Sequence, residues 1–82
     1  MPPGKHTADE ALRDGLITSK IKVRLNADPS DTHDIHVETF KGTVQLSGFV
    51  ETTEIRLVAL DLASHVEGVE RVEDLLDIRQ FG

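Results

Sequence analysis

The residues of this chain with the clearest chemical potential are the histidines and aspartates between positions 31 and 36. Asp31, His33, Asp34 and His36 lie within six residues, and these residue types bind zinc and other transition metals. On an extended chain, residues three apart face opposite sides, so His33 and His36 converge only if the loop turns sharply. Structural zinc sites also favour ligand pairs from two separate elements. We therefore predict no functional metal here, and no other segment indicates a cofactor.

Nucleophilic catalysis is the second chemistry that the residue types suggest. Ser47 and His36 lie opposite each other if a hairpin forms, but no Ser-His-Asp setting is evident, and a small open sheet offers no water-excluding pocket. The chain has no cysteine. Segment 42–48 lacks the lysine and the helix start of a phosphate-binding loop. Glu73 and Asp74 are adjacent carboxylates in a charged segment that is expected to be exposed. We predict no catalytic residues and no enzymatic activity.

Length and charge restrict the partners. The 82 residues are enough for one domain, and the formal net charge is −6. An acidic chain without a Gly-x-x-Gly loop or a basic groove is not expected to bind nucleic acid. No apolar run of about 20 residues predicts a membrane span. No export signal is visible, so the chain is either cytoplasmic or has lost such a segment.

Segment 35–50 has the pattern of a β-hairpin. Two runs of alternating apolar and polar residues flank Lys41-Gly42, which has the length of a two-residue turn. Three residue pairs then share the inner face of the hairpin: Thr39–Val44, Val37–Leu46 and Ile35–Gly48. A slip of one residue would turn the apolar residues outward, so the register is well specified. Gly48 has no side chain, which predicts the close approach of a neighbouring element, most simply a helix.

The outer face of this sheet is a candidate contact surface. Its predicted members, from the hairpin and the last strand, are His36, Glu38, Phe40, Thr43, Gln45, Ser47, Phe49, Leu75, Asp77 and Arg79. Among them His36, Phe40 and Phe49 are candidates for contact with another domain or subunit, because an open sheet has two edges to cover. The alternative is an ordinary solvated face. Phe40 and Phe49 lie near opposite ends, so they form no compact patch.

The first helix is predicted to begin between Asp9 and Asp14. Gly15 weakens its early part, which makes Asp14 the candidate cap, and Pro29 predicts its end near Asn26. A polar loop, 28–34, follows. The inner stripe of this helix repeats every four residues: Ile17, Ile21 and Leu25.

A second set of residues on this helix faces away from that stripe. Three are apolar and three are basic residues that lie between the two stripes: Leu12, Leu16, Val23, Arg13, Lys20 and Arg24. Lys22 lies on the far flank. One interpretation is scattered surface residues, which are common. The other is a contact surface for a membrane or a protein partner, with the basic residues meeting lipid phosphates.

After the hairpin the period changes from two to that of a helix. Thr52 or Thr53 is predicted to cap a second helix, with Glu54 in its first turn, and Gly68 is the predicted stop. The apolar face of this helix spans about 140° of arc and comprises Ile55, Val58, Ala59, Leu62, Ala63 and Val66. Its two alanines allow close packing on the sheet, and we expect this contact to lie over Gly48.

A third strand is predicted between Val69 and Gln80, with Val72, Leu76 and Ile78 on one face. The order α-β-β-α-β describes a small α+β domain with two helices on one face of a three-stranded sheet. The link from the second strand to the third contains a helix and is long enough for a right-handed crossover, which favours a mixed sheet. If the third strand lies beside the first, the sheet is wholly antiparallel instead.

Three motifs resemble those of the BON domain, the bacterial OsmY and nodulation domain. They are Asp14-x-x-Ile-Thr-x-Lys-x-Lys-x-x-Leu25, Val37-x-x-x-x-Gly-x-Val-x-Leu-Ser-Gly-x-Val50 and Ala59-x-x-x-Ala-x-x-Val-x-Gly-Val-x-x-Val72. The match runs from about Asp14 to Ile78 and is specific in combination. Two departures are Asp74, where the family often has Asn, and Arg24, where a small residue is common.

The resemblance implies a periplasmic or envelope-associated, non-enzymatic module that binds phospholipid or an envelope protein, with a link to osmotic stress and lipid contact on a helix. We predict a tail at 1–8, a BON-like domain at 9–80 and a short end at 81–82, in a monomeric protein. The predicted structural glycines are Gly42, Gly48 and Gly68. The favoured function is phospholipid or envelope attachment through the first helix; the alternative is protein docking through the outer sheet face or an edge strand.

Overall fold

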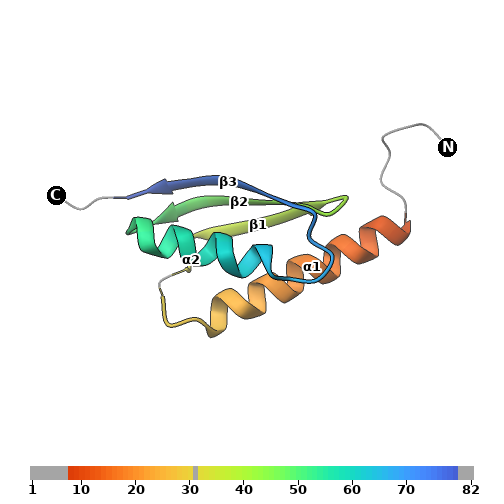
Figure 1. The fold of residues 1–82 in the computed structure, drawn as a ribbon, viewed down its shortest axis with the longest axis horizontal. Helices are drawn as coiled ribbons and strands as arrows, with labels where there is room; N and C mark the ends of the chain where they lie inside the picture. The colour runs from red at the N-terminus through yellow and green to blue at the C-terminus, as the bar shows by residue number, and fades with distance from the viewer. Residues whose placement is uncertain (1–7, 31, 80–82) are drawn as a thin grey trace.

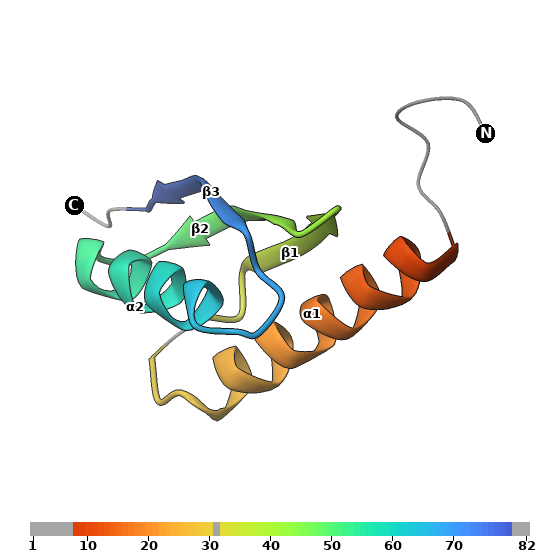
Figure 2. The ribbon, with the colours of Figure 1, turned by 45° about the vertical axis from the view of Figure 1, so that its right-hand side comes forward.

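The structure is a computed structural model that describes residues 8–30 and 32–79. Its elements are α1 (Ala8–Ala27), β1 (Ile35–Phe40), β2 (Thr43–Val50), α2 (Thr53–Ser64) and β3 (Arg71–Ile78) (Figure 1). The strand order is β1-β2-β3, with β1 antiparallel and β3 parallel to β2. Both helices lie on the same side of the sheet (Figure 2). The α+β class, the element order and the mixed sheet are therefore confirmed.

The hairpin has the register that the sequence predicts. Thr39 pairs with Val44, Val37 with Leu46 and Ile35 with Gly48. Lys41 and Gly42 have φ angles of +50° and +81°, as a two-residue turn that matches the twist of the strands requires. Val44 and Leu46 are completely buried, so the apolar face of the hairpin is the floor of the core.

The core lies between this face and the two helices. Ile17, Ile21 and Leu25 of α1 are buried, as their spacing predicts, and Ala59 and Ala63 of α2 have no exposed surface. One ion pair also joins α2 to the inner side of β3: Arg56 Nε lies 2.6 Å from Asp74 Oδ2. Glu73 and Asp74 are both partly buried and point to opposite faces of β3. The prediction that they share one exposed charged segment is therefore wrong.

The predicted cap at Asp14 is also wrong. The helix is already formed at Ala8 and continues through Gly15, and Asp14 is buried inside it at 4% exposure. A helix of 20 residues that packs on a sheet absorbs the modest cost of one interior glycine. At the other end, the Thr32 hydroxyl donates a hydrogen bond to the Leu25 carbonyl at 3.0 Å and satisfies a carbonyl that the helix leaves free.

The predicted cap of α2 is confirmed, but its predicted stop is not. Thr52 Oγ1 accepts a hydrogen bond from Ile55 N at 3.1 Å. The helix ends at Ser64, before Gly68 is reached. Gly68 has a φ angle of +97°, and a Cβ built there would lie 3.1 Å from Ile17 Cδ1. Its role is therefore to let the segment between α2 and β3 pass close to α1.

We predicted that a helix approaches Gly48, and this prediction is wrong. The neighbour of Gly48 is the backbone that precedes β1. A Cβ at Gly48 would collide with the carbonyl oxygen of Asp34, and the φ angle there is +110°. That same oxygen accepts a hydrogen bond from Phe49 N at 3.3 Å. The glycine thus allows the chain entering β1 to bond to β2.

Candidate binding surface

The outward side of α1 carries an apolar stripe that nothing in the described part of the chain covers. Leu12, Leu16 and Val23 are 68%, 60% and 67% exposed, whereas the residues on the opposite side of the helix form the core. The first turns of α1 extend beyond the hairpin turn (Figure 1). We call these three residues the exposed stripe; they share one face, as their helical spacing predicts.

Three basic residues flank the exposed stripe on one side. Arg13, Lys20 and Arg24 are all exposed, and none of them forms an ion pair with residues 8–30 or 32–79. We call them the basic flank. The structure therefore brings all six predicted contact residues of the first helix onto one surface. What that surface binds stays a prediction.

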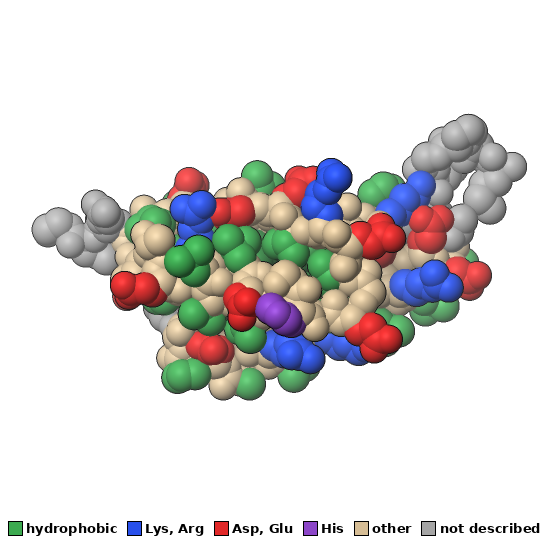
Figure 3. Space-filling model, in the orientation of Figure 1, with side chains coloured by type: hydrophobic (Ala, Val, Ile, Leu, Met, Phe, Trp, Pro, Cys, Tyr) green, Lys and Arg blue, Asp and Glu red, His purple; other side chains and the backbone are tan. Residues whose placement is uncertain are grey.

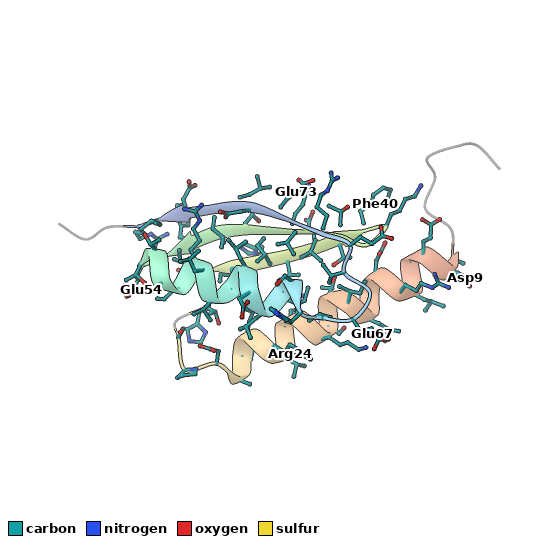
Figure 4. The ribbon with its side chains drawn as sticks, viewed as in Figure 1. Asp9, Arg24, Phe40, Glu54, Glu67 and Glu73 are labelled. Atoms are coloured by element: carbon teal, nitrogen blue, oxygen red, sulfur yellow. The ribbon has the colours of Figure 1, made fainter. Side chains whose placement is uncertain are left out.

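A cleft of about 600 Å³ runs beside this surface. One side comes from α1, and the other comes from the hairpin turn and the segment that joins α2 to β3. Its lining residues are Glu10, Arg13, Asp14, Leu16, Ile17, Lys20, Lys41, Gly42, Glu67, Gly68 and Glu70. Figure 4 shows Glu67 on the segment after α2, where it passes α1. We call this feature the charged cleft.

Two contacts hold the sides of the charged cleft in place. Gly68 packs against the side chain of Ile17, as described above, and a Cβ at Gly42 would lie 3.0 Å from Glu70 Cγ. The Gly42 carbonyl also accepts a hydrogen bond from Glu70 N at 2.9 Å. The two glycines therefore set the distance between α1, the turn and the segment after α2.

Charged side chains of both signs line this cleft. Lys41 is partnered: its Nζ lies 4.0 Å from Glu10 Oε2. Basic and acidic groups lie next to each other where α1 passes the segment after α2 (Figure 3). The cleft is therefore not a simple anion site, although the basic flank borders it.

The outer sheet face bears aromatic residues in two separate places. Phe40 and Phe49 are 52% and 43% exposed. Arg79 Cζ lies 4.4 Å from the ring centroid of Phe49, and Lys41 Nζ lies 5.5 Å from that of Phe40, at distances at which a cation is attracted to a ring. His36 is exposed on the same face. The three candidates thus share a face but form no single patch.

Two further exposed apolar residues were not among the chosen contacts, although Leu75 was predicted to lie on the outer face. Leu75 is 54% exposed and pairs in register with Ser47, next to Phe49 along the sheet. Leu57 is 58% exposed on α2. The alternation of β3 placed Leu75 on the outer face, so its spacing gave a signal for this position; Leu57 lies outside the apolar face of its helix.

Comparison with protein-family models decides the family. The model of the BON domain matches residues 13–80, most of the chain. The chain belongs to the BON domain family. Osmotically-inducible protein Y of Escherichia coli (strain K12) is 42% identical over 69 residues, which are 83% of this chain and 34% of that protein. The chain therefore spans about a third of the length of this curated relative. BON domains are binding modules.

In this BON domain, the motif residues act mainly in packing. Gly42, Gly48 and Gly68 all have positive φ angles, and each is closely approached by another part of the chain. Asp14, the first residue of the first motif, binds the hairpin turn through Lys41 N at 2.7 Å and Gly42 N at 3.0 Å. This role of Asp14 was not predicted from the sequence, although an acid on the same face as Ile17 and Ile21 needs a buried partner.

The metal ligands that the sequence suggested were Asp31, His33, Asp34 and His36. Asp31 lies outside the described part of this BON domain. Among residues 8–30 and 32–79, no three His, Cys, Asp or Glu side chains are grouped as metal ligands would be. His33 and His36 are both exposed. Over the same residues, neither helix has the length and apolar character needed to cross a bilayer.

Proposed function

We propose that this BON domain is a non-catalytic module that attaches to a phospholipid surface of the cell envelope through α1. The observation that carries this proposal is the exposed stripe, whose three apolar side chains are each at least 60% exposed on one helix face. An apolar helix face of this kind gains free energy when it enters the boundary between headgroups and acyl chains. Membership of a family of binding modules supports the proposal.

The basic flank supplies the electrostatic part of the attachment. Arg13, Lys20 and Arg24 stand beside the exposed stripe, so they reach lipid phosphates when the stripe is inserted. The domain as a whole carries a net charge of −6 and is repelled by an anionic surface. This surface of α1 must therefore face the membrane, and the attraction must weaken as salt is added.

Cosedimentation with phosphatidylglycerol vesicles at low salt tests this proposal. The double change Lys20→Glu/Arg24→Glu should reduce the bound fraction several-fold, because it reverses two of the charges that meet the lipid phosphates. For a charge-matched comparison, Lys20→Glu should bind more weakly than Lys22→Glu, since Lys22 lies on the other flank of α1. If the wild-type domain never cosediments with such vesicles at low salt, the proposal is wrong.

A second candidate is docking of a protein on the outer sheet face. The observation in its favour is the pair of neighbouring exposed residues Phe49 and Leu75, which lie beside the free edge of β3. Sedimentation velocity over a wide concentration range tests the version in which the partner is a second copy. A strict monomer at every concentration removes that version, and it is the result we expect.

The proposed place of action is the periplasm or the cell envelope, with a role in osmotic stress. The family and the name of the relative support this proposal, since that protein is described as osmotically inducible. The gene sequence upstream of Met1 tests the location. An apolar export segment there is the expected result; an upstream region without one would point to the cytoplasm.

A further inference from the structure

The charged cleft has basic groups on one side and acidic groups on the other. Arg13 and Lys20 come from α1, whereas Glu67 and Glu70 come from the segment between α2 and β3. All four side chains are exposed, and within residues 8–30 and 32–79 none of them forms an ion pair. Within the part of the chain that the structure describes, two cations and two anions therefore line one cleft without pairing.

This arrangement of basic and acidic side chains disfavours ligands that carry charges of only one sign. A simple anion that approaches Arg13 and Lys20 also meets the carboxylates of Glu67 and Glu70, and a simple cation meets the opposite problem. Lys41 adds little net positive charge, because Glu10 lies 4.0 Å from it. A ligand with an anionic group and a cationic group satisfies both sides at once.

The size and floor of the cleft fit a small headgroup with a short apolar part. Its volume of about 600 Å³ lies within the range of small-molecule sites. Leu16 and Ile17 provide apolar surface in the cleft. Leu16 also belongs to the exposed stripe, so a ligand in the cleft lies directly beside the surface that we propose to enter the membrane.

We propose that the charged cleft binds a phosphate ester that carries an ammonium group, such as the phosphoethanolamine headgroup of a phospholipid. The phosphate lies against Arg13 and Lys20, and the ammonium lies against Glu67 and Glu70. The proposal that the ligand belongs to a lipid rests on the function proposed above. The proposal that the cleft binds a phosphate and an ammonium group together does not.

Titration of the ¹⁵N-labelled domain with soluble probes tests the chemistry of the cleft. Phosphoethanolamine should shift the amide signals of Leu16, Gly42 and Gly68 in a saturable way. Glycerol 3-phosphate, inorganic phosphate and ethanolamine, each lacking one of the two charges, should bind several-fold more weakly. Equal shifts for all four probes, or shifts confined to other residues, would overturn the proposal.

Substitutions on each side of the cleft test which side binds the phosphate and which binds the ammonium group. Glu67→Gln/Glu70→Gln should weaken phosphoethanolamine binding about three- to fivefold, as expected for exposed ion pairs, and should leave glycerol 3-phosphate binding equal or tighter. Arg13→Gln/Lys20→Gln should weaken both. These side chains are exposed, so the fold should survive, and the amide spectrum verifies it. The same loss for both probes in the glutamate variant contradicts the assignment.

Vesicles separate this inference from the function on which it rests. With phosphatidylglycerol alone, the glutamate variant should bind at least as well as the wild type; with phosphatidylethanolamine mixed in, it should bind less well. Equal wild-type and variant binding on every mixture refutes the headgroup site while attachment through α1 stands. If the wild type binds no vesicle but phosphoethanolamine still saturates the cleft, the site is supported and membrane attachment is wrong.

Discussion

The carboxylate of Asp14 holds the backbone of Gly42 across the domain. Its Oδ1 accepts a hydrogen bond from Gly42 N at 3.0 Å, and its Oδ2 accepts one from Lys41 N at 2.7 Å. Both donors belong to the hairpin turn, and both have positive φ angles. The turn therefore presents two adjacent N–H groups to one buried acid, and α1 is fixed to the far end of the hairpin.

Removal of this acid should destabilise the fold. Asp14→Ala leaves two backbone donors without their charged acceptor, and we expect a loss of about 2–3 kcal/mol in the free energy of unfolding. Asp77→Asn, at an exposed carboxylate of β3, is the matched control and should cost under about 0.5 kcal/mol. Urea unfolding followed by far-UV circular dichroism is the suitable measurement, because the chain has no Trp or Tyr. Similar losses for both variants would show that the contact contributes little.

Two glycines should respond in opposite ways to replacement by alanine. Gly48→Ala places a Cβ against the Asp34 carbonyl at a φ angle of +110°, so the chain entering β1 must move, and we expect a loss of more than about 3 kcal/mol. Gly15→Ala meets no atom within 4 Å in α1 and should stabilise the domain by about 0.5–1 kcal/mol. Thermal unfolding of both variants decides this, and a stable Gly48→Ala variant would contradict the close approach seen here.

Much of the fold could be predicted from sequence, because each strand has one buried face. The alternation around Lys41-Gly42 set the register, and the Ile17 stripe gave the inner side of α1. The start of α1 and the roles of Asp14 and Gly48 could not be obtained in this way. A helix cap and a buried acid both use an aspartate, and only the position of the hairpin turn distinguishes the two. Likewise, a glycine in a strand indicates that another part of the chain lies close, but it does not identify that part.

The charged cleft could not be predicted from the sequence either, because it depends on contacts between elements that are distant in the chain. Arg13 and Lys20 were recognised as one flank of a helix, since helical spacing is local. Glu67 and Glu70 follow α2, and they join that flank only because Gly68 packs against Ile17. Contacts of this kind depend on the crossover from β2 to β3, which periodicity does not fix.

The ion pair between Arg56 and Asp74 should contribute modestly. Asp74 Oδ2 lies 2.6 Å from Arg56 Nε, and Asp74 Oδ1 accepts a hydrogen bond from Leu76 N at 3.0 Å. Asp74→Asn keeps an acceptor for Leu76 but removes the charge, so we expect a loss of under about 1 kcal/mol that shrinks at high salt. Asp74→Ala, which also removes the acceptor, should cost more. Equal losses for the two variants would assign the effect to the charge alone.

The pKa of Asp28 should lie below the ordinary value of an aspartate. The backbone N–H of Ser30, 2.9 Å from Asp28 Oδ1, and then the Ser30 hydroxyl lower the pKa of this carboxyl. Because the folded pKa is lower than the unfolded one, the resulting stabilisation is present above the unfolded pKa and is lost as pH falls through the folded pKa. Carboxyl ¹³C shifts measure this pKa directly. In Ser30→Ala it should rise but stay below the ordinary value, since the backbone donor remains; an unchanged pKa would exclude the hydroxyl as a cause.

The apolar part of membrane attachment can be separated from the basic part. Leu12→Ser removes a side chain of the exposed stripe that lies outside the charged cleft, so it should reduce vesicle binding several-fold even where salt has suppressed the electrostatic attraction. Leu57→Ser changes a leucine of similar exposure on α2 and should bind as the wild type does. Both residues are solvent-exposed, so stability should be nearly unchanged in each variant. If the two variants lose binding equally, α1 has no special part in attachment, whereas a loss confined to Leu12→Ser places the stripe of α1 in the lipid.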